Sequence, residues 1–558
     1  MRFLLTLLTI TITITITITC ARLGAGCSGD PVSALDGAEK KIFLINNRSE
    51  PRFLDLQRCN SVAEHQIMLA LSEGLVAEKK DSELEVEPGV AEKWVPNEKG
   101  DLWTFTIRKN AKWSDGVGIT AHDFVWSWQR MLSKELGSEY TTMLFLLKNG
   151  EPFFKKEMPA EQLGVRAVDD YTLEATLVGP TPHFPSIICH TSWWPVPRHA
   201  IEKHGSIYDV MNPWTQQENL VSNGPFKMKR YLFKQYVEVQ RNPHYWDAAN
   251  VKLDGVRFYP IDKDLTEDRL FRRGQLHATY ATPPSKVPRY LKDHKDIVRN
   301  YQSLAIRFYR INTTRKPLDD MRVRQALGFA LDRESIVKNV LRANQTPCYG
   351  LTPPIREYET ANFFSLDVAK AQKLLAEAGF PGGQGFPELE LLIAKSEVEV
   401  SMAEAVQAMW RRALGISIRI KQVDFTVQLT MQHSKQYDIA VAGWSADYYD
   451  PATFVDMWKT DGGNNETGWS NKEFDSLVDA ATQCADAQER LRILNRAEAI
   501  ATREAPVVPI YVYTRTRLIH PAVKDFQPRA LDNWLWKHID LQYPVPPSSM
   551  DALLTATD

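Results

Sequence analysis

The sequence predicts an α/β protein that carries an additional α+β region, and two patterns along the chain support this. Between residues 367 and 444, segments with helical spacing alternate with short apolar runs, which is typical of a largely parallel sheet covered by helices. Between residues 102 and 178, strand-like alternation surrounds one amphipathic helix. The length of 558 residues, at roughly 150 residues per domain, predicts three or four folding units.

The elements predicted in the first third of the chain follow from local signals. Residues 41–45 and 102–108 have the apolar content or the alternation of strands. A helix is expected to begin after Thr120, because Asp123 stands three residues later at the spacing of a capping box. Residues 165–178 are predicted to form a β-hairpin.

The last third contains three predicted helices and three predicted strands in alternation. Gly379 and Gly415 follow the first two helices, where the left-handed C′ position favours glycine. The expected elements are helix 367–378, strand 389–394, helix 400–414, strand 416–420, helix 425–434 and strand 437–444. Ligands of such sheets bind beyond the carboxyl ends of the strands, so residues 443–451 are a candidate site.

Composition places the chain among ordinary globular proteins. Hydrophobic residues make up 44 % and charged residues 24 % of the chain, which argues against extensive disorder. Lys and Arg together number 67 and Asp and Glu 69, so the formal net charge is −2. A near-neutral chain does not favour nucleic acid as a partner, because that binding depends on excess positive charge.

The amino terminus has the features of an export signal of the lipoprotein type, predicted at 1–26. Arg2 is followed by an apolar stretch and then by small residues before Cys27. This order makes Cys27 the expected lipidation site, with Cys20 as a second candidate and an ordinary cleaved signal as the alternative. The protein is therefore expected in the periplasm or cell envelope, attached to a membrane through a lipid anchor.

The sequence contains none of the common catalytic and metal-binding motifs. The chain lacks the GxSxG, GxxxxGK[ST] and HExxH motifs. Cys59, Cys189, Cys348 and Cys484 are far apart and show no CxxC spacing, so no zinc site is expected and their pairing stays open. We therefore expect neither an enzyme nor a bound metal or cofactor.

The segment 443–451 places a carboxylate among aromatic rings. Asp447 lies between Trp444 and the neighbouring pair Tyr448 and Tyr449. A carboxylate walled by rings suits a cationic organic group such as an ammonium. The alternative is that Asp447 caps the next helix and that the rings belong to the core. Local composition favours neither interpretation.

Seven motifs, in order over essentially the whole mature chain, carry a family resemblance. They are AEKW at 91–94, WTFTIRKNAKWSDG at 103–116, TAHDFVWSWQR at 120–130, DDMRVRQAL at 319–327, GLTPP at 350–354, GWSADYYDP at 443–451 and VPIY at 508–511. These motifs resemble those of the bacterial oligopeptide-binding proteins, which are extracytoplasmic solute-binding proteins of family 5 and serve as receptors of peptide ABC importers.

The resemblance implies a two-lobed, periplasmic-binding-protein-like fold of type II, with an extra α+β subdomain on one lobe. The expected regions are 41–72 plus 198–304 plus 514–546 for the first lobe, 73–197 for its extension and 305–513 for the second lobe. The chain would cross between the lobes near Ala305 and Tyr513, and these crossings would form a hinge that closes on the ligand.

The resemblance also implies how a ligand is held. In this family the peptide lies extended between the lobes and pairs through its main chain with strand edges, which gives affinity independent of side chains. Asp447 stands where the family holds the peptide's α-ammonium. The other expected ligand-binding residues are Gly443 and Ser445 on one edge, Asn60, Ser61 and Val62 on the other, and Tyr140, Tyr513, Trp444, His190 and Phe308 around side-chain pockets. The alternatives are a plain loop at 60–62 and core packing for the rings.

The sequence departs from the family where close relatives place cations for the peptide's carboxylate. The corresponding positions are Leu341, Glu399, Gln432 and Val441, and none is cationic. Three explanations remain open: another base holds the carboxylate, the ligand is longer, or the ligand has no free carboxylate. The nearest candidate bases in sequence are Arg307, Arg310 and Arg342.

The implied function is that of a non-enzymatic, monomeric receptor that captures a peptide ligand and delivers it to the membrane permease of an ABC transporter. A second hypothesis keeps the fold and replaces the ligand with a modified or non-peptide solute, such as a cell-wall fragment. A third, an exported peptide hydrolase, is less favoured because the sequence offers no identifiable nucleophile or metal set.

Overall fold

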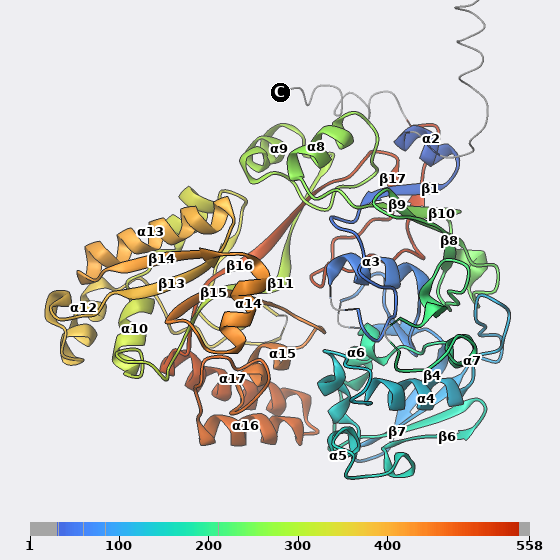
Figure 1. The fold of residues 1–558 in the computed structure, drawn as a ribbon, viewed down its shortest axis with the longest axis horizontal. Helices are drawn as coiled ribbons and strands as arrows, with labels where there is room; N and C mark the ends of the chain where they lie inside the picture. Colours follow the sequence, from blue (N-terminus) through green and yellow to red (C-terminus); the bar gives the residue numbers. More distant parts are fainter. Residues whose placement is uncertain are drawn as a thin grey trace, which may run out of the picture.

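The computed structural model of the protein describes residues 31, 33–59, 61–83, 85–209, 211–355 and 357–545. The predicted export signal at 1–26, the expected lipidation site Cys27 and the expected edge residue Asn60 lie outside these residues. The described chain forms two bodies, on the left and right of Figure 1, that are joined by two long strands. This is the predicted two-lobed α/β architecture, with an additional subdomain on one body.

A four-stranded sheet forms the centre of the first body (Figure 1, upper right). Its strand order is β1-β10-β9-β8, with β1 parallel to β10 and the other pairs antiparallel. The strands are β1 (Ile42–Asn46), β8 (Phe226–Leu232), β9 (Tyr236–Arg241) and β10 (Gly255–Tyr259), and the helices of this part are α2 (Ala34–Glu39), α3 (Val62–Leu71), α7 (Arg198–Lys203), α8 (Asp264–Arg272) and α9 (Val287–Asp293). The strand expected at 41–45 is confirmed as β1.

The additional subdomain is built on a second four-stranded sheet, below the first in Figure 1. The order is β4-β5-β7-β6, and every pair is antiparallel. Its elements are β4 (Ala91–Pro96), β5 (Leu102–Ile107), α4 (Ala121–Met131), α5 (Gly150–Phe154), β6 (Val165–Asp169), β7 (Thr172–Thr176) and α6 (Phe184–Ile187), preceded by the hairpin β2 (Val76–Glu78) and β3 (Val86–Pro88). The predicted hairpin is β6–β7, and the Thr120 N–H donates to Asp123 Oδ2 at 2.8 Å as the capping box requires.

The second body contains a six-stranded sheet of order β12-β16-β11-β15-β13-β14. The strands are β11 (Val298–Ile311), β12 (Thr346–Pro347), β13 (Leu389–Ala394), β14 (Ile418–Val423), β15 (Ile439–Ser445) and β16 (Val507–Leu518). The helices are α10 (Met321–Phe329), α11 (Arg333–Ser335), α12 (Val368–Glu377), α13 (Glu397–Leu414), α14 (Phe425–His433), α15 (Ala452–Val455), α16 (Lys472–Thr482) and α17 (Ala487–Glu504). All six elements predicted between 367 and 444 are present, with ends within about three residues of the expected bounds. Outside the main sheets, β17 (Val523–Lys524) pairs with β18 (Asp540–Leu541).

The expectation of a largely parallel sheet in the second body is wrong. Strand β13 is parallel to β14 and β15, but the pairs of β11 with β15, β11 with β16 and β12 with β16 are antiparallel. The local pattern at 367–444 correctly indicates the parallel part. Strands β11 and β16 come from distant segments, and local alternation carries no information about their direction.

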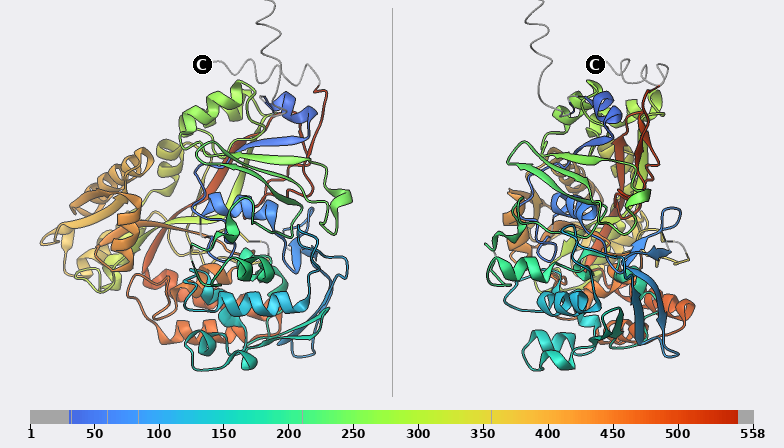
Figure 2. Two further views of the ribbon diagram at one scale, coloured as in Figure 1. Left: turned by 45° about the vertical axis from the view of Figure 1, so that its right-hand side comes forward. Right: turned by 90° about the vertical axis from the view of Figure 1, so that its right-hand side faces the viewer.

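Two long strands connect the bodies. Strands β11 and β16 pair from Val298 opposite Leu518 to Arg310 opposite Val507. Figures 1 and 2 show both strands leaving the body on the right of Figure 1 and entering the sheet of the body on its left. The register shifts between Gln302 and Ile306. Such irregularities bend a strand locally, so a bend lies where the chain passes between the bodies.

Separate hydrophobic cores stabilise the parts of the fold. One core draws on residues 38–71, 194–278 and 519–541, a second on residues 75–193, and two more cover the opposite faces of the six-stranded sheet. Tyr309 and Val441 belong to one face, and Phe308 and Ala442 to the other. Alternation of side chains along β11 and β15 produces this division.

The four described cysteines are free thiols, with Cys59 and Cys348 buried. In the described part of the chain, no helix has the length and apolar character needed to cross a membrane. Across the same residues, no group of three or more His, Cys, Asp or Glu side chains is arranged to hold a metal ion.

Candidate functional site

A hollow lies where the two bodies and the subdomain meet. Its walls come from residues 59, 61, 62 and 65 of the first body, 78, 140, 186 and 189–191 of the subdomain, 445–448 of the second body, and 531 and 533 near the carboxyl terminus. The predicted site residues that line it are Ser61, Val62, Tyr140, His190, Ser445 and Asp447. The fold therefore brings together residues that are hundreds of positions apart in sequence.

Asp447 is a half-buried carboxylate that has no counter-charge among the described residues. Burial raises the pKa of Asp447 to about 7. The Asp447 N–H donates to Thr453 Oγ1 at 3.4 Å, but none of the described residues donates to the carboxylate. Helix α15 begins after Pro451, so Asp447 is not its cap. A cation is therefore the group that this position lacks.

Asp450, three residues later, has such a partner within the chain. Arg490 of α17 donates to both carboxylate oxygens of Asp450, each at 2.8 Å. Burial alone would raise the pKa of Asp450, but Arg490 and His183 together hold it below its ordinary value. Arg490 Nη2 also lies 3.0 Å from His183 Nε2, so the ion pair contacts the subdomain. Asp450 therefore belongs to a buried ion pair within the chain.

Aromatic and imidazole rings form one wall of the hollow. The ring centroids of Tyr140 and His190 are 4.7 Å apart, and those of His190 and His65 are 6.3 Å apart in a stacked arrangement. Burial lowers the pKa of both histidines, that of His190 to about 3, so both rings are neutral at pH 7. Neutral imidazoles do not compete with a cationic ligand for Asp447.

His65 and Asn533 were not predicted from the sequence, although both line the hollow. His65 Nε2 lies 3.0 Å from Asn533 Oδ1. His65 stands one turn into α3, which begins after Ser61 with a capping box to Glu64. That box could have indicated the helix and placed His65 near Ser61. No local pattern points to Asn533, which reaches the hollow from the distant carboxyl-terminal segment.

Strand β15 has a free backbone edge next to Asp447. Strand β13 pairs only with the first two residues of β15. The Ala446 N–H donates to a β11 carbonyl at 2.8 Å, whereas the Val441 carbonyl faces away from β11 and accepts from Gln428 Nε2 at 2.9 Å. Backbone groups alternate in direction along a strand, so those of Gly443 and Ser445 point to the free edge. Both residues are exposed.

Tyr513 of β16 lies over Gly443. A Cβ at position 443 would stand 3.2 Å from the Tyr513 hydroxyl and 3.0 Å from the Ile306 carbonyl oxygen. Glycine therefore leaves room for the tyrosine above the strand edge. Neither residue lines the hollow around Asp447, and they lie farther along the same edge.

Trp444 and Phe308 pack on the opposite face of this sheet. Trp444 is half-buried against the core there, and its Nε1 donates to Thr453 Oγ1 at 3.3 Å. Phe308 is 0 % exposed, with its ring centroid 5.5 Å from that of Trp458. The expectation that Phe308 borders a ligand does not match its place in this structure, because alternation along β11 directs its ring into the core.

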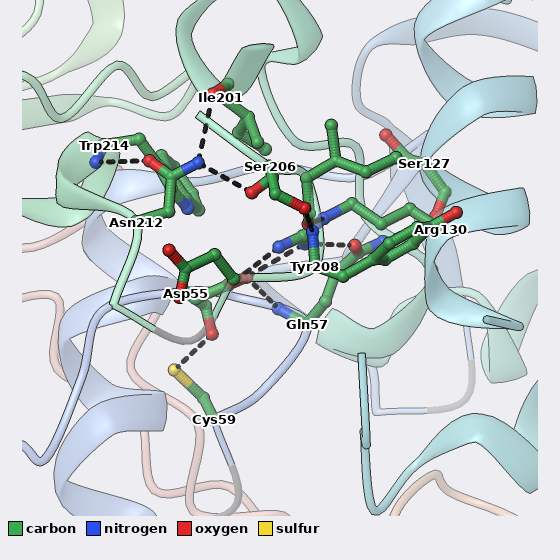
Figure 3. A network of polar contacts seen from close by, with 12 residues as sticks. Asp55, Gln57, Cys59, Ser127, Arg130, Ile201, Ser206, Tyr208, Asn212 and Trp214 are labelled. Atoms are coloured by element: carbon green, nitrogen blue, oxygen red, sulfur yellow. Dashed lines mark hydrogen bonds and ion pairs between the residues drawn. The ribbon is translucent and has the colours of Figure 1, made fainter. Parts of the chain in front are cut away.

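The segment that precedes Ser61 is fixed by a buried polar network (Figure 3). Arg130 of α4 donates to Asp55 Oδ2 and to Gln57 Oε1, both at 2.7 Å. Gln57 in turn donates to the Ser127 carbonyl at 2.7 Å. The side chains of Arg130 and Asp55 are only 2 % and 6 % exposed, so this ion pair ties the first body to the subdomain. Val62, just beyond the fixed segment, is 45 % exposed.

The three arginines considered for a ligand's carboxylate are all engaged within the chain. Arg307 is ion-paired with Glu399. Arg310 is ion-paired with Glu466 and donates to Gln432 Oε1 at 2.9 Å. Arg342 is exposed and donates from Nε to the Asn339 carbonyl at 2.8 Å. Leu341 and Val441 are buried in the core.

Comparisons with known proteins identify a family to which the chain is similar over most of its length. Residues 85–466 match the family model described as bacterial extracellular solute-binding proteins, family 5 Middle. The chain is 35 % identical over 528 residues to the periplasmic oligopeptide-binding protein OppA of Salmonella typhimurium, covering 92 % of this chain and 95 % of that protein. It is 31 % identical over 499 residues to the periplasmic murein peptide-binding protein MppA of Escherichia coli, covering 88 % and 91 %. The solved structure of Haemophilus influenzae OppA in complex with RPPGFSPFR is similar with a TM-score of 0.79 and 30 % identity, covering 90 % of this chain and 99 % of that one.

Proposed function

The chain belongs to the bacterial extracellular solute-binding proteins of family 5, and from this premise we propose that it captures oligopeptides between its two bodies. It then delivers them to the membrane permease of an ABC importer. The relative OppA of Salmonella typhimurium is named a periplasmic oligopeptide-binding protein, and this chain matches it over nearly its full length.

The unpaired carboxylate of Asp447 carries this proposal. It lies in a hollow whose walls come from both bodies and the subdomain. The α-amino group of a peptide has an ordinary pKa of about 7.7–8.0, so it is cationic at neutral pH. Pairing with this cation relieves the unfavourable burial of the Asp447 charge. A peptide bound here supplies the missing counter-charge and contacts both bodies at once.

The free edge of β15 pairs with the main chain of the ligand in this proposal. Gly443 and Ser445 direct their backbone groups to that edge, and main-chain pairing accepts many side-chain sequences. Residues 60–62 provide the opposing edge in this proposal, and they follow in sequence the segment with Asp55 and Gln57 that Arg130 holds in place. The rings of Tyr140, His190, Trp444 and Tyr513 border the ligand's side chains, where water molecules adapt to each guest.

The proposed lobes have the boundaries expected from the sequence: 41–72, 198–304 and 514–546 for the first, 73–197 for its extension, and 305–513 for the second. The separate hydrophobic cores support this division, because they change near the same residues. The irregularity of β11 between Gln302 and Ile306 supports a hinge near Ala305, close to Tyr513 on β16.

We further infer that the protein is a monomeric receptor without a cofactor and is not an enzyme. Its family consists of solute-binding proteins. A lipid anchor at Cys27 rests on the sequence pattern of residues 1–27. Labelling with a radioactive fatty acid tests the anchor: the wild type should incorporate label and Cys27→Ala should not. A wild type without label would contradict it.

A modified or non-peptide solute, such as a cell-wall fragment, is the alternative ligand. One relative is named a murein peptide-binding protein. The engagement of Arg307 and Arg310 within the chain also favours ligands without a conventional free carboxylate.

Mass spectrometry of ligands that co-purify with the protein, followed by calorimetric titration with the same compounds, tests the proposed function. We expect peptides with free amino termini that bind with micromolar or lower dissociation constants. Cell-wall fragments in their place would establish the alternative. Turnover of a peptide library by the pure protein would contradict a receptor.

A further inference from the structure

A second charged cluster lies beside the free edge of β15, at Gly443 and away from Asp447. Arg307 of β11 stands opposite Gly443 in the strand register. Its Nη1 donates to the Tyr513 hydroxyl at 3.1 Å, and its Nη2 is ion-paired with Glu399 of α13. Because Tyr513 lies over Gly443, the cluster borders the edge that holds the ligand's main chain in the proposed function.

The ion pair is partly exposed and incompletely satisfied. The side chains of Arg307 and Glu399 are 14 % and 15 % exposed. Arg307 Nε and Glu399 Oε2 are buried atoms that have no hydrogen-bond partner among the described residues. An arginine without an acidic partner would offer a planar fork of donors, which is the preferred partner of a carboxylate. Here Glu399 occupies that fork, and its charge repels a second carboxylate.

The place of the cluster determines which part of a ligand meets it. Gly443 precedes Asp447 by four residues, which is about 13 Å of extended chain at roughly 3.3 Å per residue. An extended peptide with its amino group at Asp447 covers that distance with about four residues. The carboxyl end of a tetrapeptide or pentapeptide, or the main chain of a longer ligand, therefore passes Arg307 and Glu399.

We propose that Glu399 is a specificity-determining residue that neutralises Arg307 and so removes any preference for a free carboxylate at the fourth or fifth ligand position. The site then accepts peptides that continue past this point or that end there in an uncharged group. This inference rests on the proposed function and names its ligand class. Arg310 does not replace Arg307, because it is 7 % exposed and its guanidinium contacts Glu466 and Gln432.

The test compares matched peptides of three to six residues that end in a free acid or an amide, by calorimetry on the full chain. For the wild type, the two forms should bind within about threefold of each other at every length. Glu399→Gln should expose the Arg307 fork and favour the acid by about tenfold or more, at four or five residues only. The double variant Glu399→Gln with Arg307→Met should return the ratio to near one.

Glu466→Gln is the matched control, because it makes the same change at the buried Arg310 pair and should keep the wild-type ratio. A tenfold preference of the wild type for the acid at any length would overturn the proposal. A Glu399→Gln variant that binds peptides with the wild-type ratio would also overturn it. If Glu399→Gln does not fold, the wild-type length series decides alone. If no peptide binds in either form, the proposed function fails instead.

Discussion

Two aspartates on one loop differ in burial and in their electrostatic surroundings, because Asp447 is half-buried whereas Asp450 is buried. Burial raises the pKa of Asp447 to about 7, because no described residue supplies a counter-charge. Asp450 receives two hydrogen bonds from Arg490, and its pKa lies below its ordinary value. An unpaired buried charge destabilises a fold. Asp450 is therefore neutralised by an ion pair within the chain, whereas the carboxylate of Asp447 fits a cation from outside the chain.

The two ends of the proposed ligand site, at Asp447 and at Gly443, also differ in whether their charged groups are already paired within the chain. At one end Asp447 lacks a cation, whereas about 13 Å away, at roughly 3.3 Å per residue, Arg307 is already neutralised by Glu399. The difference implies that a ligand is recognised by its amino end and tolerated at its other end.

Arg490→Met should produce the largest effect, a fall of about 3–5 kcal/mol in the free energy of unfolding, because Asp450 would remain buried without its counter-charge. Chemical denaturation at pH 7.5 measures this. Arg492→Met, an exposed arginine on the same helix, is the control and should change the value by about 0.5 kcal/mol or less. A loss below about 1 kcal/mol for Arg490→Met would mean that the ion pair is not structural.

Asp447→Asn should weaken peptide binding by about 100-fold or more, because the ligand's ammonium would be left buried without a carboxylate. Calorimetric titration at pH 7.5 measures the dissociation constants. Asp461→Asn, which neutralises an exposed carboxylate of the same body, should leave affinity unchanged. A change of less than about threefold for Asp447→Asn would remove it from the site.

The same Asp447→Asn variant should be more stable than the wild type without ligand. The folded pKa of Asp447 is raised above the unfolded value, so its stabilising contribution is complete below pH 4 and is lost as pH rises to about 7. Asparagine avoids this loss. We expect a gain of about 1–3 kcal/mol at pH 8 and almost none at pH 4, allowing for the partial exposure of the side chain. Equal stabilities at pH 8 would show that Asp447 is not strained by burial.

Peptide affinity should be highest between about pH 7 and 8. Below pH 7, Asp447 must release a proton to bind the ammonium, so the dissociation constant should rise by up to about tenfold per pH unit. Above pH 8 the ligand amine itself loses its proton. His190 stays neutral over this range, because burial lowers its pKa to about 3, and burial also lowers the pKa of His65. Titrations from pH 5.5 to 9 measure the profile, and a flat profile would contradict an ammonium–carboxylate contact.

Local patterns predicted the elements of this fold better than their assembly. Glycines after two helices and the Thr120 capping box located several ends correctly, because these signals act within a few residues. The direction of β11 and β16 could not be predicted from alternation, since it depends on where distant segments meet. Phe308 shows the same limit: its ring belongs to the core because of the strand's register, which the sequence alone does not specify.

In the candidate site too, some features could be predicted from the sequence and others could not. Asp447 could be singled out from its aromatic neighbours and from a family motif, and the structure adds that its carboxylate has no partner in the described part of the chain. The pairing of Asp450 with Arg490, and that of Arg307 with Glu399, could not be predicted. In each pair the partners come from separate elements, and their contact follows from packing rather than spacing.

The most direct test of the account is the affinity of one co-purifying peptide measured with a free and with an acetylated amino terminus. Acetylation removes the ligand's positive charge and leaves the rest of the peptide unchanged. The account predicts that the acetylated form binds about 100-fold more weakly at pH 7.5, and that Asp447→Asn binds both forms with similar, low affinity. Equal affinity of the wild type for the two forms would contradict Asp447 as the anchor of the ligand's amino group.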